Sequence, residues 1–283
     1  MSVADFVTLE GALSYDCLNC WIVKLTALSS FCALMLLFCP VSKGQDDGLL
    51  FRGDTLLVQG DTLPYLLYNF DTLDDKVELP LVIFLHGAGE RGDDNQLQLR
   101  HCVRYFMQDT IRDKFNFRML IPQCGSAYRW AETDWTLPSH TMEATPSHPM
   151  SALMYLLDSL IATHRVDTCR IYAVGISMGG FGVWDLMQRR PNLLAAAVPI
   201  CGGGDPSFAM QLTSIPIRIF HGKRDRLVMP SRSVQMYEAI RSCGGEQVSL
   251  ELFDDLGHAC WNRPFEQCGI IGWLFSQRKY PLK

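Results

Sequence analysis

The chain has 283 residues, and its 25 basic and 30 acidic side chains leave a formal net charge of −5 at pH 7. This near balance gives no indication of nucleic-acid binding, and the length fits one large domain or two small ones. Hydrophobic residues make up 48% of the sequence, which is typical of a globular protein with a sizeable core. We find no internal repeat and no low-complexity tract.

An apolar run over residues 25–41 is followed by a small-x-small tripeptide that ends at Gly44, and a polar stretch begins at Gln45. This order predicts a secretory signal that is cleaved after Gly44, and hence a secreted or periplasmic protein. The stretch before the run carries three acidic side chains and one lysine, whereas a typical signal begins with basic residues. An uncleaved membrane anchor and a buried helix therefore stay open as alternatives. We expect residues 1–44 to be a signal peptide or anchor and residues 45–283 to form one folded domain.

The sequence has 11 cysteines, and four of them lie before the predicted cleavage site. The remaining number is odd, which leaves at least one free thiol, and spacing alone does not pair the others. The motif Cys17-x-x-Cys20 has no second cysteine or histidine pair at the spacing of a zinc site. The sequence therefore indicates neither a metal site nor a scaffold built on disulfides.

After the leader, two strand-like runs, Leu50–Val58 and Thr62–Phe70, flank Gly60-Asp61 and predict a β-hairpin. The next apolar run, Leu79–Leu85, predicts a buried strand. It leads into the glycine-rich loop His86–Gly92, which lacks both of the common phosphate-binding patterns of nucleotide sites.

A helix is predicted from Asp94 to Asp109, and a short strand from Met119 to Pro122. A long irregular stretch, Gln123–His148, follows and contains Trp130 and Trp135. Long loops in compact domains are often functional, so the two tryptophans are candidates for lining a substrate cleft. The alternative is that they fasten the stretch to the body of the domain.

The stretch Arg170–Pro191 is the most informative part of the sequence. It combines a buried strand, the G-x-S-x-G pentapeptide around Ser177 and a helix. In this context the motif predicts a nucleophile elbow, whose strained backbone holds the serine Oγ above the sheet edge. The amide of Met178 would lie at the helix N-terminus, where it suits a tetrahedral oxyanion. The alternative is an ordinary turn between a strand and a helix.

With such a serine, the glycine-rich loop after the Leu79–Leu85 strand gains a role. A backbone N–H near Ala88 or Gly89 would supply the second oxyanion donor, and Gly87 and Gly89 would let the backbone approach the substrate carbonyl. We expect Glu90 and Arg91 to form an ion pair that holds this loop.

The remaining elements alternate between helices and strands. Helices are predicted over Met150–His164, Ser231–Cys243 and Phe265–Phe275, and strands over Leu194–Ile200, Ile215–Phe220 and Val248–Phe253. This alternation predicts a mostly parallel, doubly wound α/β sheet, with the N-terminal hairpin as an antiparallel addition and no large cap domain. The candidate polar residues all follow strand ends, where such sheets bind ligands.

A serine nucleophile needs a base, and the base needs a group that orients it. The order Ser, Asp, His along the chain fits Ser177, Asp225 and His258. Asp205, one strand earlier, is the alternative acid. The alternative reading of His258 is a surface histidine in a glycine-rich loop.

Six runs carry a resemblance to known enzymes. They are LVIFLHGAGERGDDN (81–95), PQC with a following tryptophan (122–130), VGISMGGFGVW (174–184), AAAVPICGGGD (195–205), IFHGKRDRLV (219–228) and DLGHACW (255–261). With them the chain resembles the α/β-hydrolase superfamily. Within it, the chain is similar to the bacterial carboxylesterases grouped with polyhydroxybutyrate depolymerases, phospholipase/carboxylesterases and prolyl-oligopeptidase-like predicted peptidases. The resemblance extends over nearly all of the chain after the leader.

The resemblance implies that Ser177 is the nucleophile, Asp225 the acid and His258 the base. It also implies that Ala88 and Met178 supply the oxyanion amides, and that no metal or organic cofactor takes part.

The sequence thus predicts a serine carboxylesterase with an α/β-hydrolase catalytic domain over residues 45–283. We expect a short-chain or aromatic acyl ester, linked to a carbohydrate or another small molecule, because Trp130 and Trp135 on a polar stretch suit a sugar or an aromatic ring. We expect no nucleic-acid partner and no stable membrane association after signal removal. The alternatives are a serine peptidase and a catalytically silent binding protein on the same fold.

Overall fold

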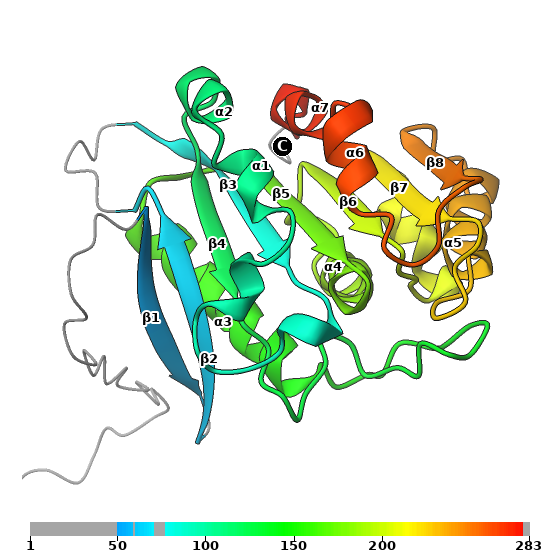
Figure 1. Cartoon of the computed structure of the whole chain (residues 1–283), viewed down its shortest axis with the longest axis horizontal. Helices are drawn as coiled ribbons and strands as arrows, with labels where there is room; N and C mark the ends of the chain where they lie inside the picture. The colour runs from blue at the N-terminus through cyan, green and yellow to red at the C-terminus, as the bar shows by residue number, and fades with distance from the viewer. Residues whose placement is uncertain (1–49, 59, 71–76, 280–283) are drawn as a thin grey trace, which may run out of the picture. The chain divides into compact units, whose positions relative to one another are not determined.

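The computed structural model describes residues 50–58, 60–70 and 77–279, so the predicted leader, residues 1–44, lies outside the described residues. An eight-stranded sheet forms the centre of the described part (Figure 1). Its strands are β1 (Phe51–Val58), β2 (Asp61–Tyr68), β3 (Leu79–Leu85), β4 (Arg118–Pro122), β5 (Val166–Ile176), β6 (Ala196–Ile200), β7 (Ile217–Gly222) and β8 (Val248–Phe253).

The strands lie in the order β1-β2-β4-β3-β5-β6-β7-β8. The pairs β1–β2 and β2–β4 are antiparallel, and all pairs from β4–β3 to β7–β8 are parallel. The predicted hairpin and parallel sheet are confirmed, and the fold is that of an α/β hydrolase. Because β3 and β5 to β8 run in the same direction, the loops that follow them meet at one edge of the sheet.

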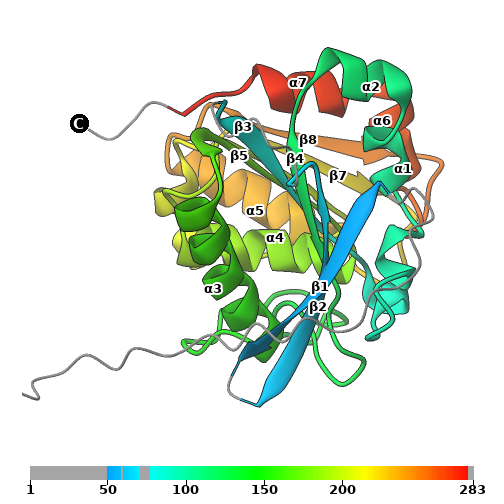
Figure 2. The same ribbon diagram turned by 90° about the vertical axis from the view of Figure 1, so that its left-hand side faces the viewer.

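Helices cover both faces of the sheet. They are α1 (Val103–Phe106), α2 (Asp109–Lys114), α3 (His148–Thr163), α4 (Met178–Arg189), α5 (Ser231–Ser242), α6 (Asn262–Gln267) and α7 (Ile270–Ser276). Figure 2 shows α3, α4 and α5 on one face and α1, α2, α6 and α7 on the other. None of the helices in the described residues is both long and apolar enough to span a membrane.

Each face of the sheet has its own apolar core. Ile171 and Ala173 of β5 join the cluster under α3, α4 and α5. Tyr172, Val174 and Ile176 join the cluster on the opposite face, with α1, α6 and α7. Side chains alternate along a strand, so a strand covered on both faces is apolar throughout. This explains the continuous apolar run that precedes the serine.

The single helix predicted over Asp94–Asp109 is wrong. In its place lie a 3-10 turn (Leu97–Leu99), α1 and the start of α2. Asn95 and Cys102 have φ angles of 55° and 62°, which interrupt a right-handed helix. The Asp94 carboxylate accepts two backbone N–H groups that follow it, so the segment turns around this side chain.

The single closing helix predicted over Phe265–Phe275 is also wrong, because α6 and α7 are separate. Gly269 lies between them in the left-handed conformation, with φ of 60°. Glycine adopts this conformation without a steric penalty, so it ends one helix and begins the next in a new direction.

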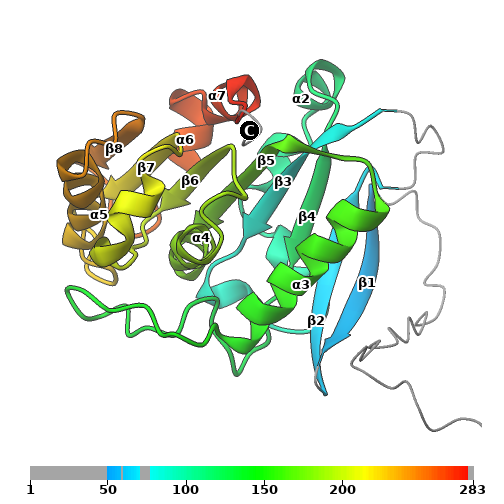
Figure 3. The ribbon, with the colours of Figure 1, turned by 180° about the vertical axis from the view of Figure 1, so that it is seen from behind.

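The long segment between β4 and α3 passes the start of α4 and extends toward α5 (Figures 1 and 3). Hydrogen bonds to α5 and to the loop after β6 hold this segment in place. Arg232, at the start of α5, donates to the carbonyl oxygen of Asp134 (2.7 Å) and to Nδ1 of His140 (2.6 Å). The carboxylate of Asp205 accepts the amide of Met142 at 2.9 Å. The segment therefore forms a fixed wall beside the start of α4.

Candidate active site

Ser177 lies between the end of β5 and the start of α4. Its backbone angles, φ 54° and ψ −118°, are strained for a residue with a side chain, as in a nucleophile elbow. A Cβ on Gly175 would lie 2.2 Å from the carbonyl oxygen of Gly179, and a Cβ on Gly179 would lie 1.9 Å from that of Leu85. Both glycines are therefore needed for the turn to close.

Three side chains from separate loops form a hydrogen-bonded row at this edge of the sheet. Ser177 Oγ lies 2.8 Å from Nε2 of His258, which is on the loop after β8. Nδ1 of His258 lies 2.7 Å from Oδ2 of Asp225, which is on the turn after β7. The Asp225 side chain has no exposed surface, whereas 18% of the His258 side chain is exposed. The row thus runs from the buried carboxylate of Asp225 to Ser177, which is half-buried at the edge of the sheet.

The environment of Asp225 keeps this carboxyl group ionised. Burial alone would raise its pKa, but the hydrogen bonds from His221, His258 and the Val228 amide outweigh burial and hold the pKa of Asp225 well below its usual range. A carboxylate beside an imidazole favours the protonated form of that ring.

Asp205, the alternative acid, has other partners. One carboxylate oxygen accepts the amide of Met142 and the other accepts the amide of Ser207, each at 2.9 Å. Its position at the start of a 3-10 helix explains the second bond, since aspartate is a common N-cap. The structure therefore places Asp225 beside His258 and uses Asp205 to hold the neighbouring loops.

Two segments that carry the expected oxyanion donors flank Ser177. Met178 is the first residue of α4, so its amide has no partner within the helix. On the other side, a Cβ built on Gly87 would lie 3.7 Å from Cβ of Ser177, which shows how closely the glycine-rich loop approaches. Ala88 is half-buried and Gly89 is exposed on the same loop.

His86 anchors this loop from below. It is completely buried, its Nε2 accepts the amide of Cys124 at 2.9 Å, and its Nδ1 lies 2.7 Å from the carbonyl oxygen of Gly87. Burial lowers the pKa of His86 to about 4, so the ring is neutral and carries its hydrogen on Nδ1. The indole N–H of Trp130 donates to the carbonyl oxygen of His86 at 3.2 Å.

The predicted ion pair between Glu90 and Arg91 is wrong. The Arg91 guanidinium donates to the carbonyl oxygens of Ala88 (3.0 Å) and Tyr128 (3.3 Å) and so ties the loop to the segment after β4. Glu90 is buried, and its carboxylate lies 3.5 Å from Nε2 of His101.

The two tryptophans of the long segment differ in their surroundings. Trp130 has no exposed surface. It packs so tightly on α4 that a Cβ on Gly182 would lie 2.6 Å from the Cβ of Trp130. The expectation that Trp130 faces a substrate is therefore wrong. Trp135 is half-buried, packs against Phe181, and has the Arg129 guanidinium 4.5 Å above its ring.

Two neighbours of the row were not identified from the sequence. The rings of Trp261 and His258 lie edge to face, with centroids 5.8 Å apart at 86°, and the Trp261 ring is also 5.3 Å from the ring of His101. Its closeness in sequence to His258 is the one signal that pointed to it. His221 contacts Asp225, and no pattern in the sequence distinguishes it from other strand-end histidines.

Within the described residues, no group of three or more His, Cys, Asp or Glu side chains is arranged to hold a metal ion. The seven cysteines in this part of the chain are all free thiols.

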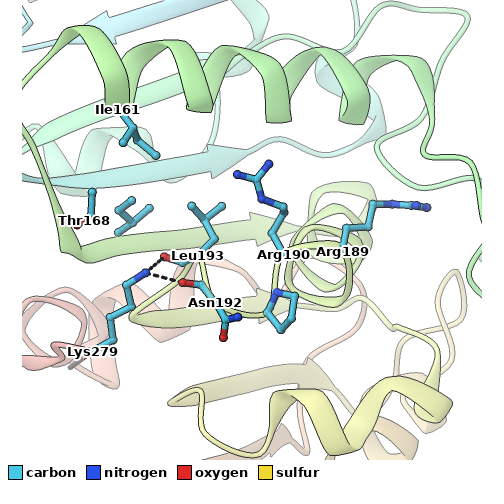
Figure 4. A pocket seen from close by; sticks show the side chains of 9 residues that line it. Ile161, Thr168, Arg189, Arg190, Asn192, Leu193 and Lys279 are labelled. Atoms are coloured by element: carbon cyan, nitrogen blue, oxygen red, sulfur yellow. Dashed lines mark hydrogen bonds between the residues drawn. The ribbon is translucent and has the colours of Figure 1, made fainter. Parts of the chain in front are cut away.

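A separate cavity of about 360 Å³ lies at the opposite end of β5, beside the end of α4 (Figure 4). Its basic side chains already have partners. Arg190 binds the carboxylate of Asp158, and Nζ of Lys279 donates to the carbonyl oxygens of Asn192 (2.5 Å) and Leu193 (2.9 Å). It shares no lining residue with the hydrogen-bonded row.

Comparison with curated proteins identifies esterases. Esterase YpfH of Escherichia coli (strain K12) is 29% identical over 93 residues, which is 33% of this chain and 40% of its own length. The bifunctional acetylxylan esterase/xylanase XynS20E of Neocallimastix patriciarum is 25% identical over 142 residues, which is 50% of this chain and 18% of its own length. The chain thus spans less than half the length of these two relatives.

A solved structure described as a thermostable esterase matches with a TM-score of 0.73 and 32% sequence identity, over 81% of this chain and 64% of that one. The family model for phospholipase/carboxylesterase matches residues 73–269, from before β3 to the end of α6, and so includes Ser177, Asp225 and His258. The chain belongs to the phospholipase/carboxylesterase family of α/β hydrolases.

Proposed function

We propose that this protein is a serine carboxylesterase in which Ser177 is the nucleophile, His258 the base and Asp225 the acid. The observation that carries the proposal is the row of contacts from Ser177 Oγ to His258 Nε2 (2.8 Å) and from His258 Nδ1 to Asp225 Oδ2 (2.7 Å). A strained serine, an imidazole and a buried carboxylate in this order are the parts that acyl transfer needs.

In the first half of the reaction, Ser177 Oγ attacks the ester carbonyl while Nε2 of His258 takes its proton. The Asp225 carboxylate stabilises the imidazolium, and the amides of Met178 and Ala88 stabilise the tetrahedral oxyanion. When the intermediate collapses, Nε2 returns the proton to the leaving alcohol and an acyl-serine remains. In the second half, His258 activates a water molecule in the same way, and the carboxylic acid leaves.

We further propose that the substrates are esters of short-chain or aromatic acids, including acyl groups on sugars. In the described residues, the long segment between β4 and α3 is the one large excursion near the site, and it holds more polar than apolar side chains. A long acyl chain needs a deep apolar channel, whereas the half-buried rings of Trp135 and Trp261 suit a flat or small group. The similarity to an acetylxylan esterase supports an acetyl group on a carbohydrate.

The decisive experiment compares Ser177→Ala with the unchanged chain on 4-nitrophenyl acetate. We expect the variant to fold normally and to lose at least about a thousandfold of kcat, because triad members act as a unit. A variant that keeps more than about a hundredth of the rate would contradict the assignment. In the unchanged chain, a fluorophosphonate probe should label Ser177, as peptide mass spectrometry would show.

The substrate proposal is tested by comparing kcat/KM for acetyl, butyryl, feruloyl and palmitoyl esters, with a peptide amide in the same panel. Preference for acetyl or feruloyl esters supports it. Preference for the palmitoyl ester contradicts the short-chain proposal, and preference for the amide would favour a serine peptidase. No turnover of any compound would favour a binding protein.

We also propose that residues 1–44 direct the protein to a secreted or periplasmic location and are removed after Gly44. The apolar run over residues 25–41 and the small residues before the polar stretch support this. N-terminal mass spectrometry of the exported protein should find Gln45 at or near its start. An intact leader on membrane-associated protein would favour an anchor.

A further inference from the structure

Asp225 contacts a second imidazole besides that of His258. Nε2 of His221 lies 3.1 Å from Oδ2 of Asp225, the same oxygen that lies 2.7 Å from Nδ1 of His258. His221 is near the end of β7 and is completely buried. The two rings therefore meet at one carboxylate oxygen.

The neighbours of His221 decide which of its nitrogens carries a hydrogen. Besides Asp225, Nε2 faces the carbonyl oxygen of Val228 at 3.0 Å. A carboxylate and a carbonyl oxygen only accept hydrogen bonds, so Nε2 carries a hydrogen. Nδ1 lies 2.8 Å from Oγ of Ser233: in the neutral ring Nδ1 accepts the single hydrogen of that hydroxyl, and in the cationic ring Nδ1 donates to Oγ while the hydroxyl donates to the carbonyl oxygen of Gly202. In either protonation state, His221 is a donor to Asp225.

Ser233 holds the far side of the His221 ring. Its Oγ, on the first turn of α5, also lies 3.0 Å from the carbonyl oxygen of Gly202, and its side chain is fully buried. Gly202 follows β6 and packs against α4, because a Cβ at this position would lie 2.6 Å from the carbonyl carbon of Gly180. The orientation of His221 is thus tied to the backbone that supports Ser177.

The second carboxylate oxygen of Asp225 also accepts two hydrogen bonds. Oδ1 of Asp225 accepts the amides of Leu227 and Val228, each at 2.9 Å. With His221 and His258 on Oδ2, the carboxylate has four donors, which is its full capacity. Burial raises the pKa of Asp225, and the hydrogen bonds from His221, His258 and the Val228 amide lower it.

We propose that His221 is a positioning residue of the esterase, which fixes Oδ2 of Asp225 opposite His258, and that Ser233 orients His221 for this task. The inference rests on the proposed function, because His221 acts through the acid of that triad. Without the Nε2–H donor, Oδ2 would keep a single partner in a buried site and could turn away from His258. The imidazolium that forms in the transition state would then be less well stabilised.

Steady-state kinetics on 4-nitrophenyl acetate test this with three variants. His221→Leu removes the donor at similar volume, and we expect kcat to fall by about 10–100-fold, by analogy with the outer hydrogen-bond partners of metal-ligating histidines, with KM within about threefold. His221→Gln places an amide N–H close to the position of Nε2 and should recover most of the loss. Ser233→Ala should lower kcat by about three- to tenfold, because the ring loses its orienting partner.

A double-mutant cycle with Asp225→Asn distinguishes an effect of His221 on Asp225 from a general loss of stability. If His221 acts through Asp225, His221→Leu should cost less than about threefold in the Asp225→Asn background. Leu157→Ala, in the core contributed by α3, is the control for stability, and it should lower the melting temperature while kcat stays near that of the unchanged chain.

Wild-type kcat in folded His221→Leu, or the same fold-loss in both backgrounds, overturns the proposal. If His221→Leu does not fold, His221→Gln and Ser233→Ala test the proposal in its place. An unchanged kcat in Ser233→Ala then overturns the proposal. Hydrolysis that survives Ser177→Ala would instead contradict the proposed function. Hydrolysis that is lost in Ser177→Ala but kept in His221→Leu contradicts this inference alone.

Discussion

Asp205 and Asp225 follow neighbouring parallel strands, yet Oδ2 of Asp225 lies 2.7 Å from Nδ1 of His258, whereas the Asp205 carboxylate binds the amides of Met142 and Ser207. Both aspartates are buried at the same edge of the sheet. The difference arises because the turn after β7 directs Asp225 toward the loop after β8. The Asp225 carboxylate thereby contacts His258, and the Asp205 carboxylate holds the segment between β4 and α3.

This relationship predicts unequal effects for two matched substitutions. Asp225→Asn should lower kcat by about 10⁴-fold, as in the serine-protease example, because the amide leaves His258 in the wrong tautomer. Asp205→Asn should keep kcat within about tenfold and mainly lower the melting temperature, since an N-cap and a loop anchor are weakened. Steady-state kinetics and thermal unfolding of both variants provide the test. If Asp205→Asn lost more kcat than Asp225→Asn, Asp205, which follows β6, would be assigned as the acid instead.

The fold was predictable because its strands are unusually explicit in the sequence. A strand buried on both faces must be apolar throughout, so Leu79–Leu85 was recognised to the residue. The helices between residues 94 and 114 were not, because they depend on backbone turns around Asp94 and Cys102 that helical periodicity does not contain.

The site was predictable to the extent that strand order determines it. Ser177 and His258 are 81 residues apart, but both follow parallel strands and so share one edge of the sheet. Side-chain burial was not predictable, because Trp130 is buried by the close approach of α4 at Gly182, a tertiary contact. The hydrogen bond from His221 to Asp225 was not predictable either, because it also depends on tertiary packing.

The burial of His86 predicts a loss of stability in mild acid. The pKa of His86 is lowered to about 4 in the folded protein, against about 6.5 in the unfolded chain. The unfolded state therefore binds more protons below pH 6.5, so the stability that the neutral ring contributes is complete above this pH and declines as pH falls toward 4. Between pH 7 and pH 5 we expect a loss of about 2 kcal/mol from this group.

Two measurements check this prediction. Urea unfolding at pH 7, 6 and 5 should show a decline that is shallower in His86→Gln than in the unchanged chain. Proton NMR should find that the C–H signals of His86 do not titrate above pH 5 in the folded protein. Equal slopes in the two chains, together with a titration near pH 6.5, would contradict the neutral buried ring.

Two glycines with opposite surroundings make a matched pair for stability. A Cβ on Gly179 would lie 1.9 Å from the carbonyl oxygen of Leu85, so Gly179→Ala forces α4 away from β3 and should destabilise the fold by at least about 3 kcal/mol. Gly272, in α7, has nothing within 4 Å of such a Cβ, and Gly272→Ala should stabilise by up to about 1 kcal/mol through helix propensity. Calorimetry of both variants measures the difference. Similar melting temperatures would show that the turn tolerates a side chain.

The last prediction concerns the alcohol half of the ester. In the proposed mechanism His258 passes its proton to the leaving alcohol, so that group would lie on the His258 side of Ser177, where Trp261 is the neighbouring ring at 5.8 Å. A flat alcohol can pack on a half-buried indole, and such ring contacts contribute about 0.5–1.5 kcal/mol, or up to about tenfold in kcat/KM. We therefore expect Trp261→Ala to lower kcat/KM for phenyl acetate several-fold more than for ethyl acetate.

The ethyl ester in this comparison also reports on His258, the proposed base. If Trp261 serves only to support the His258 ring, Trp261→Ala lowers kcat/KM for the phenyl and ethyl esters by the same factor, and the proposed alcohol contact is excluded. Trp261→Phe, which keeps a ring, should restore the preference for the phenyl ester. Trp273→Ala is the matched control, since Trp273 of α7 packs under the guanidinium of Arg218 near the start of β7, the end of that strand opposite to Asp225, and it should leave the ratio between the two esters unchanged.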